Sequence, residues 1–175
     1  MNLNSSNEEN EQQSIGRYMI IGMWVVGLVL ATLLTNNWLA KQRNPNNAVV
    51  TSLAGDKRQI TLQRGRHGHY LLTGKINGYN IDFLVDTGAT SVSIPADFAE
   101  RIGLRRGAPI QISTANGIST AYKTRIDSLQ MGELEVSNAT AHINPGLRDE
   151  VLLGMSVLKH YELVQRGETL VIREP

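Results

Sequence analysis

Asp86, Thr87, Gly88 and Ala89 form the stretch of the chain whose residue types point most directly to chemistry. They follow the hydrophobic run 81–85 (Ile-Asp-Phe-Leu-Val), and this tetrapeptide occurs once in the 175 residues. Two carboxylates about 3 Å apart share one proton, so one acts as a general base and the other as a general acid. Such a pair activates a water for attack on a carbonyl carbon. We therefore predict that Asp86 is one half of a catalytic carboxylate pair.

The three residues after Asp86 suit a loop that supports a carboxylate. Gly88 lets the backbone approach the carboxylate closely, because it has no Cβ. The Thr87 hydroxyl can bridge to a partner loop, and backbone N–H groups of the loop can hold the carboxylate oxygens. The alternative is that Asp86 is a simple turn residue, since Asp and Gly both favour turns.

No second carboxylate of the same chain suits the pair. Asp82 lies on the same face of the predicted strand, but four residues at about 3.3 Å each place it roughly 13 Å from Asp86. Asp127, Asp149 and Glu150 lie in polar, turn-like contexts without a flanking glycine loop, which favours solvated loop charges. The second carboxylate is therefore expected from Asp86 of a second copy, and this predicts a homodimer.

Short apolar runs separated by Gly or Asn-Gly turns surround the Asp86 loop. They predict strands at 70–76, 79–85, 91–94, 161–165 and 169–173. Residues 96–104 read as a short helix or turn, and 156–160 as one helical turn. The pattern predicts an all-β domain with one short helix, at 156–160.

A second hairpin is predicted around Asn116-Gly117, between strands at 110–115 and 118–122. Its tip has small and polar residues, which suits a mobile flap over a substrate groove. The expected flap residues are Ala115, Asn116 and Gly117, and the alternative is an ordinary surface hairpin. Further on, the apolar run 151–155 (Val-Leu-Leu-Gly-Met) holds the place in the second half that 84–89 holds in the first, without an aspartate.

The chain resembles the retropepsin-type aspartic proteases, in particular their bacterial, membrane-anchored, single-domain members. The resemblance rests on the segments 74–78, 83–89, 116–117 and 152–158 in that order, and it covers about residues 66–175. It implies a small closed β-barrel and an aspartic-type endopeptidase that acts on peptide or protein substrates. It also implies a catalytic Asp86, a homodimer, a flap at Asn116-Gly117 and a C-terminal strand, 169–173, in the dimer interface.

Composition excludes several other functions. The net charge is +1 and no Lys or Arg run alternates with aromatic residues, so no nucleic-acid partner is expected. The absence of Cys excludes disulfides, Cys-ligated zinc and thiol nucleophiles. His67 and His69 have no ligand spacing with His142 or His160, so neither a metal nor a cofactor is expected. The alternative function is a catalytically silent retropepsin-like module for binding or dimerisation.

The N-terminal region predicts a membrane anchor. Residues 18–40 have no charged side chain, about 20 residues suffice to span a bilayer, and Trp24 and Trp38 suit anchoring positions. A polar segment precedes the run and no small-residue cleavage site follows it, which favours a transmembrane helix over a signal peptide. We therefore divide the chain into a polar tail (1–17), a transmembrane helix (18–40), a linker (41–61) and a protease domain (62–175).

Two indicators of membrane orientation disagree. Arg17 is the cation close to the N-terminal side of the span, whereas Lys41, Arg43, Lys57 and Arg58 follow it, which favours a cytoplasmic domain. The resemblance implies the opposite, a single-pass protein of the bacterial inner membrane with its domain in the periplasm. We follow the resemblance.

Overall fold

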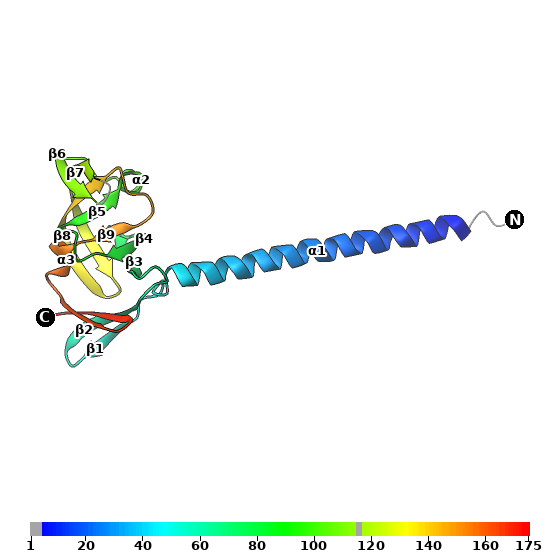
Figure 1. The fold of residues 1–175 in the computed structure, drawn as a ribbon, viewed down its shortest axis with the longest axis horizontal. Coiled ribbons are helices and arrows are strands. Elements are labelled where there is room, and N and C mark those ends of the chain that lie inside the picture. Colours follow the sequence, from blue (N-terminus) through cyan, green and yellow to red (C-terminus); the bar gives the residue numbers. More distant parts are fainter. Residues whose placement is uncertain (1–4, 115–116) are drawn as a thin grey trace. The chain divides into compact units, whose positions relative to one another are not determined.

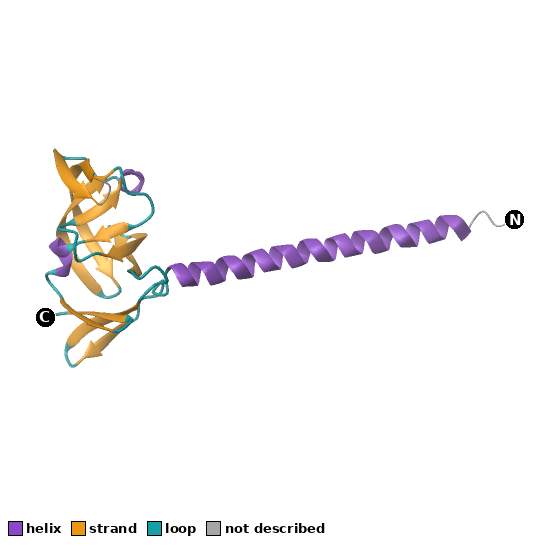
Figure 2. Ribbon diagram, in the orientation of Figure 1, coloured by secondary structure: helices purple, strands orange, loops and turns teal. Residues whose placement is uncertain are grey.

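The computed structural model describes residues 5–114 and 117–175. This part of the chain separates into two units, with the boundary between Lys41 and Gln42. The first unit consists of most of α1 (Ser5–Arg43), and the second contains all the strands and two short helices (Figures 1 and 2).

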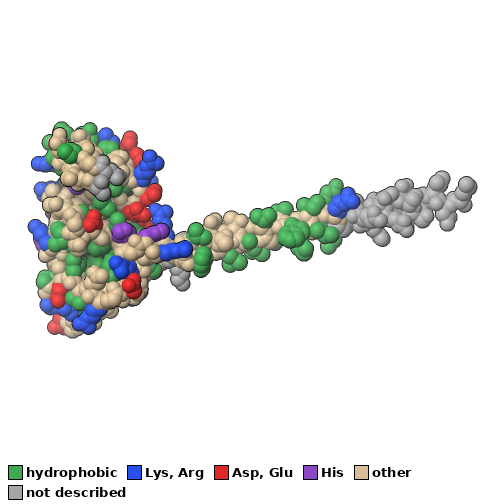
Figure 3. All heavy atoms as spheres, viewed as in Figure 1, with side chains coloured by type: hydrophobic (Ala, Val, Ile, Leu, Met, Phe, Trp, Pro, Cys, Tyr) green, Lys and Arg blue, Asp and Glu red, His purple; other side chains and the backbone are tan. Residues whose placement is uncertain are grey.

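Helix α1 carries a long apolar segment. Arg17–Asn36 has a mean hydropathy of 2.1, and none of it is buried. Hydrophobic side chains project along the visible face of this segment (Figure 3), and exposed ones include Trp24, Leu28 and Leu34. The helix is therefore long and apolar enough to cross a membrane, although signal sequences near an N-terminus share both properties.

The larger sheet closes on itself. Its strands follow the order β3-β4-β9-β5-β8-β7-β6, and a further pairing of β3 with β7 closes the first six into a ring. Their bounds are β3 (Tyr70–Ile76), β4 (Tyr79–Val85), β5 (Val92–Pro95), β6 (Pro109–Thr114), β7 (Gly117–Met131), β8 (Leu134–Asn144) and β9 (Val151–Leu153). Gly74 permits the closure, because a Cβ there would collide with the Gln130 carbonyl oxygen and the Phe83 ring. The predicted closed β-barrel is confirmed.

A smaller antiparallel sheet has the order β1-β2-β11-β10. Its strands are β1 (Thr51–Ala54), β2 (Lys57–Gln63), β10 (Glu162–Arg166) and β11 (Thr169–Arg173). The segment 41–61, expected as a linker, thus holds β1 and most of β2. Ile60 and Leu62 of β2 are fully buried, which explains why this polar segment joins the domain.

Strand β11 was expected to lie in the dimer interface, but its pairing within the chain leaves it no free edge. It lies between β2 and β10 and pairs with both along its length. Both of its edges are therefore occupied within one chain, so β11 has no free edge to pair with a second copy.

One hydrophobic core joins the two sheets. Ile60 and Ile172 of the smaller sheet belong to the same buried cluster as Phe83, Ile126 and Leu153 of the larger one. The two short helices are α2 (Ala96–Arg101), which follows Pro95, and α3 (Met155–Leu158). Helix α3 lies where the single short helix was expected, and α2 is formed where the sequence allowed a short helix or a turn.

Candidate active site

Asp86 is positioned by two parallel strands that are far apart in the sequence. Strands β4 and β9 lie side by side (Figure 1), with Val85 opposite Leu153. The Asp86 N–H continues this pairing, since it donates to the Leu153 carbonyl oxygen at 3.1 Å. The next residue after Leu153 is Gly154. The position beside Asp86 on the second strand therefore carries no side chain, as the comparison of the two halves of the sequence predicted.

The loop after Asp86 turns back on its carboxylate. The Gly88 N–H donates to Asp86 Oδ1 at 2.9 Å, and the Ala89 N–H donates to the Asp86 carbonyl oxygen at 3.3 Å. A Cβ on Gly88 would lie 3.2 Å from Oδ1, closer than most Cβ contacts allow. Asp86 is half-buried, whereas Thr87 and Gly88 are exposed. The loop thus holds one carboxylate oxygen and leaves its tip accessible.

Helix α3 fixes the end of the same loop. The N–H groups of Met155 and Ser156 donate to the carbonyl oxygens of Ala89 and Thr90 at 2.8 and 2.9 Å. The Ser156 hydroxyl also accepts a hydrogen bond from the Val92 N–H at 3.2 Å. The loop from Asp86 to Val92 is thus attached to β9 and α3 along its length.

Gly154 is required by this close approach. A Cβ on it would lie 2.5 Å from the Ser91 carbonyl oxygen and 2.7 Å from that of Ala89. Backbone atoms cannot give way as a flexible side chain does, so only glycine fits between β9 and α3.

Ser91 and His142 form a contact that sequence reasoning missed. Ser91 Oγ and His142 Nδ1 are 2.8 Å apart, although the residues are separated by 51 positions. Burial lowers the pKa of His142 below its ordinary value, because the charged imidazolium loses hydration. In the sequence His142 was considered only as a metal ligand, and no local pattern connects it to Ser91.

The other carboxylates considered from the sequence have partners or positions of their own. Asp82 accepts hydrogen bonds from the Thr73 hydroxyl at 2.6 Å and the Asn44 side-chain amide at 3.0 Å. Asp149 and Glu150 lie 3.6 and 2.8 Å from Arg43 and form ion pairs with it. The turn-like setting predicted for Asp127 is wrong, because this exposed residue lies within β7.

The short segment after α1 binds the strands that lead to the Asp86 loop. Apart from its Asn residues, no sequence pattern indicates these contacts. Asn44 and Asn46 are 5% and 6% exposed. The Asn46 side chain accepts from the Gln63 N–H at 2.7 Å and donates to the carbonyl oxygens of Gln63 and Leu71 at 2.9 and 2.7 Å. It thereby connects β2 to β3, while Asn44 reaches Asp82 on β4, the strand that ends directly before Asp86.

The hairpin predicted as a flap is formed by β6 and β7. Thr114 pairs with Gly117, and the Thr114 hydroxyl donates to the Gly117 carbonyl oxygen at 2.8 Å. Gly117 has φ +107°, a conformation that favours glycine. Ala115 and Asn116, the other two predicted flap residues, lie outside the described residues. Ile118, next to this tip, is 77% exposed.

The model of the family described as gag-polyprotein putative aspartyl protease matches residues 72–160, which include the Asp86 loop, the β6–β7 hairpin and α3. The chain belongs to this family. Its retropepsin-like character, inferred from the sequence, is thereby confirmed.

Two relatives of this aspartyl protease family member come from bacteria. It is 30% identical over 135 residues to an uncharacterized Sinorhizobium protein encoded 5' of cobV, covering 74% of this chain and 58% of that protein. It is 29% identical over 117 residues to an uncharacterized protein of Rickettsia prowazekii, covering 65% of this chain and 50% of that protein. The chain thus spans between half and three fifths of the length of these curated relatives.

Among solved structures, the chain is similar to a retropepsin-like aspartic protease from Rickettsia conorii. The TM-score is 0.58 at 26% sequence identity, and the match covers 72% of this chain and 95% of that one. The aspartyl protease fold of this chain is therefore retropepsin-like, as expected.

Proposed function

We propose that this protein is an aspartic endopeptidase in which Asp86 of two identical chains forms the catalytic pair. The observation that carries the proposal is the environment of Asp86. The Leu153 carbonyl and the Gly88 N–H hold it at the end of β4, while Gly154 stands at the neighbouring position of β9. One chain thus supplies one loop aspartate, and the chemistry of the family requires a second.

The paired carboxylates would share one proton. The ionised Asp86 takes a proton from a water, and the water attacks the carbonyl carbon of the scissile peptide bond. The protonated Asp86 of the second copy gives its proton to the carbonyl oxygen. The pair must hold one proton to act, with one Asp86 ionised and the other protonated. Activity is therefore expected to be highest at acidic pH.

The dimer would form across the Asp86 loop. Thr87 and Gly88 at the loop tip are exposed, and the strand residues Leu84 and Val85 before it are only half-buried. These groups are available to a second copy, whereas both edges of β11 are already paired. We therefore place the interface at the loop and not at the C-terminal strand.

Substrate would bind between this loop and the β6–β7 hairpin. The proposed flap residues are Ala115, Asn116 and Gly117, followed by the exposed Ile118. A β-hairpin over a groove favours a peptide in extended form, since a strand edge pairs with extended backbone. We infer extended, largely apolar peptide segments as the cleaved class.

The apolar part of α1 would anchor the enzyme in a membrane. We propose a polar tail at 1–17, a single span at 18–40, and the inner membrane of a bacterium as the location, with the domain in the periplasm. The predicted linker (41–61) and protease domain (62–175) are better taken together, because β1 and β2 pair with the rest of the domain. Confinement to a membrane raises the effective concentration of the chains and so favours the dimer.

The decisive experiment is hydrolysis of a peptide library by the full-length chain and by Asp86→Asn. The substitution is nearly isosteric and removes the shared proton, so turnover is expected to fall by about 10²–10⁴-fold or more. Asp56→Asn, in the exposed turn between β1 and β2, is the matched control and should keep full activity. Undiminished turnover by Asp86→Asn would refute the assignment, and an inactive but dimeric wild type would support a silent binding module.

A further inference from the structure

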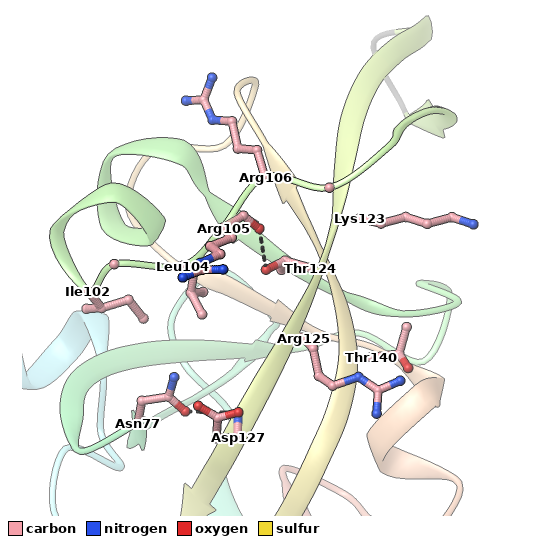
Figure 4. Close-up of a pocket in the computed structure, with 12 residues that line it drawn as sticks. Asn77, Ile102, Leu104, Arg105, Arg106, Lys123, Thr124, Arg125, Asp127 and Thr140 are labelled. Atoms are coloured by element: carbon pink, nitrogen blue, oxygen red, sulfur yellow. Dashed lines mark hydrogen bonds between the residues drawn. The ribbon is translucent and has the colours of Figure 1, made fainter.

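A pocket of about 690 Å³ opens beside β7, and none of its lining residues belongs to the Asp86 loop. Pockets of this size suit ligands or short peptide segments. The loop after α2 forms one wall, β7 forms another, and Asn77 and Thr140 complete it (Figure 4). The proposed peptidase mechanism makes no use of this pocket.

Strand β7 has an unpaired stretch of backbone within the pocket. At Lys123 its edge is still paired, since the Lys123 carbonyl accepts from the Gly107 N–H at 2.7 Å and its N–H donates to the Ala108 carbonyl at 3.0 Å. Four residues further, Asn77 Oδ1 accepts from the Asp127 N–H at 3.1 Å. Backbone groups of alternate residues point to the same edge, so the N–H and C=O of Arg125 face the gap between these contacts. Over the described residues, no strand or loop is paired with Arg125 on this side.

The pocket is strongly cationic. Arg105, Arg106, Lys123 and Arg125 line it, against the single carboxylate of Asp127. All four cationic side chains are exposed, and none of them forms an ion pair within residues 5–114 and 117–175. Such a group of unpaired cations attracts anionic ligands.

The directions of these side chains indicate the shape of the ligand. In Figure 4, Arg106, Lys123 and Arg125 extend in different directions and do not converge on one point. The Arg106 guanidinium lies over the Tyr122 ring, 5.5 Å from its centroid. A compact anion such as phosphate needs converging donors. An extended chain with several carboxylates can instead meet these cations one at a time.

We propose that this pocket is a docking site for an acidic polypeptide segment that binds in extended form along the free edge of β7. Its backbone would pair with the N–H and C=O of Arg125, as in strand addition. Its Asp or Glu side chains would meet the guanidinium and ammonium groups at the rim. Gly117 and Arg125 lie on one extended strand, about 26 Å apart at 3.3 Å per residue. The docked segment therefore lies outside the residues cleaved beneath the flap, and its role as part of the substrate rests on the proposed peptidase function.

The test measures peptide binding with the full-length Asp86→Asn chain in a neutral detergent, so that no cleavage interferes. The probe is a short fluorescent peptide with alternating Glu and Thr residues, and its matched control carries Gln in place of Glu. The acidic peptide is expected to bind at least about 10-fold more tightly, because hydrogen bonds between charged groups are the stronger ones. Its affinity should fall as salt is added.

Variants then locate the site. Lys123→Gln combined with Arg125→Gln should weaken binding of the acidic peptide by about 10-fold or more. Lys159→Gln combined with Arg166→Gln removes the same charge from exposed positions outside the pocket and should leave binding unchanged. Equal binding of the two peptides, or full binding by the Lys123 and Arg125 variant, would overturn the proposal.

Two further probes test whether the pocket binds another kind of anion in place of an acidic peptide. If pyrophosphate binds as tightly as the acidic peptide, the pocket takes compact anions and the proposal is wrong. The proposal is equally wrong if Lys123 and Arg125 are needed for binding to phosphatidylglycerol vesicles while the peptide does not bind. Binding is measured with Asp86→Asn, which needs no peptidase activity. The docking proposal and the proposed peptidase function can therefore fail independently of each other.

Discussion

Asp86 donates its backbone N–H to the carbonyl oxygen of Leu153 at 3.1 Å, so the proposed catalytic residue is held by β9, the strand that ends directly before Gly154. This pairing brings β9 and α3 against the loop from Asp86 to Val92. The geometry of the loop therefore depends on residues almost 70 positions away in the sequence, and on how closely Gly154 approaches it.

Gly154→Ala is expected to destabilise the domain. The new Cβ would meet the carbonyl oxygens of Ser91 and Ala89 at 2.5 and 2.7 Å, and backbone must move to relieve this. Overpacking of this kind lowers the free energy of unfolding by about 1–3 kcal/mol. Chemical denaturation followed by circular dichroism measures the change. A variant as stable as the wild type would show that β9 and the loop are less tightly joined than the structure indicates.

Gly88→Ala is expected to affect activity more than stability. Its Cβ would lie 3.2 Å from Asp86 Oδ1, and the exposed loop can relieve the contact by a small displacement of the carboxylate. A displaced catalytic group lowers kcat, here by about 10-fold or more. The measurement is kcat and the unfolding midpoint of the same preparation. Full kcat in this variant would contradict a positioning role for Gly88.

The parts of this protein that could be predicted from sequence are those with local patterns. Asp86 and its loop follow an apolar run, and an Asn-Gly turn separates β3 from β4, whereas β8 and residues 123–131 of β7 were not predicted. In contrast, β1 and β2 lie in a polar segment where only Ile60 and Leu62 alternate as buried residues. Such a short alternation does not distinguish an ordered strand from a linker.

Contacts that depend on strand register could not be predicted. Ser91 meets His142 because β5 and β8 are parallel neighbours with Ser93 opposite His142. The free edge at Arg125 exists because β6 and β3 both pair with β7 but leave a gap between them. Neither relationship has a counterpart in the spacing of residues along the chain.

Asn46→Ala is expected to destabilise the domain although the residue lies within the segment 41–61 that was predicted as a linker. The substitution leaves the Gln63 N–H and the Leu71 carbonyl oxygen without their partner in a buried place. Unsatisfied buried groups cost about 1–3 kcal/mol of unfolding free energy. Asn47→Ala, at the exposed neighbouring position, is the matched control and should stay within about 0.5 kcal/mol of the wild type. Equal stability of both variants would show that Asn46 does not connect β2 to β3 in solution.

His142 is expected to make the domain less stable as pH falls. Burial lowers its pKa in the folded protein, so the unfolded chain takes up the proton first. The stabilisation is therefore complete above the ordinary His pKa of about 6.5 and is lost as pH falls through the lowered value. His142→Gln removes this titration and should reduce the drop in unfolding midpoint between neutral and mildly acidic pH. The exposed His160→Gln is the control, and an identical pH dependence in all three proteins would refute the role of His142.

Activity is expected to require two wild-type chains. For a truncated chain that begins at Gln42 and so retains Asn44 and Asn46, the rate should rise with the square of concentration while monomer predominates. The full-length chain in vesicles should keep its specific activity on dilution at constant protein-to-lipid ratio, because the membrane maintains the local concentration.

An equimolar mixture with Asp86→Asn tests the pair directly, since random pairing leaves about half of the wild-type chains in mixed dimers. Those dimers hold one carboxylate, so the activity per wild-type chain should fall by about half. Unchanged activity in the mixture, with constant specific activity of a monomeric truncated chain, would show that one Asp86 suffices and that the shared pair is wrong.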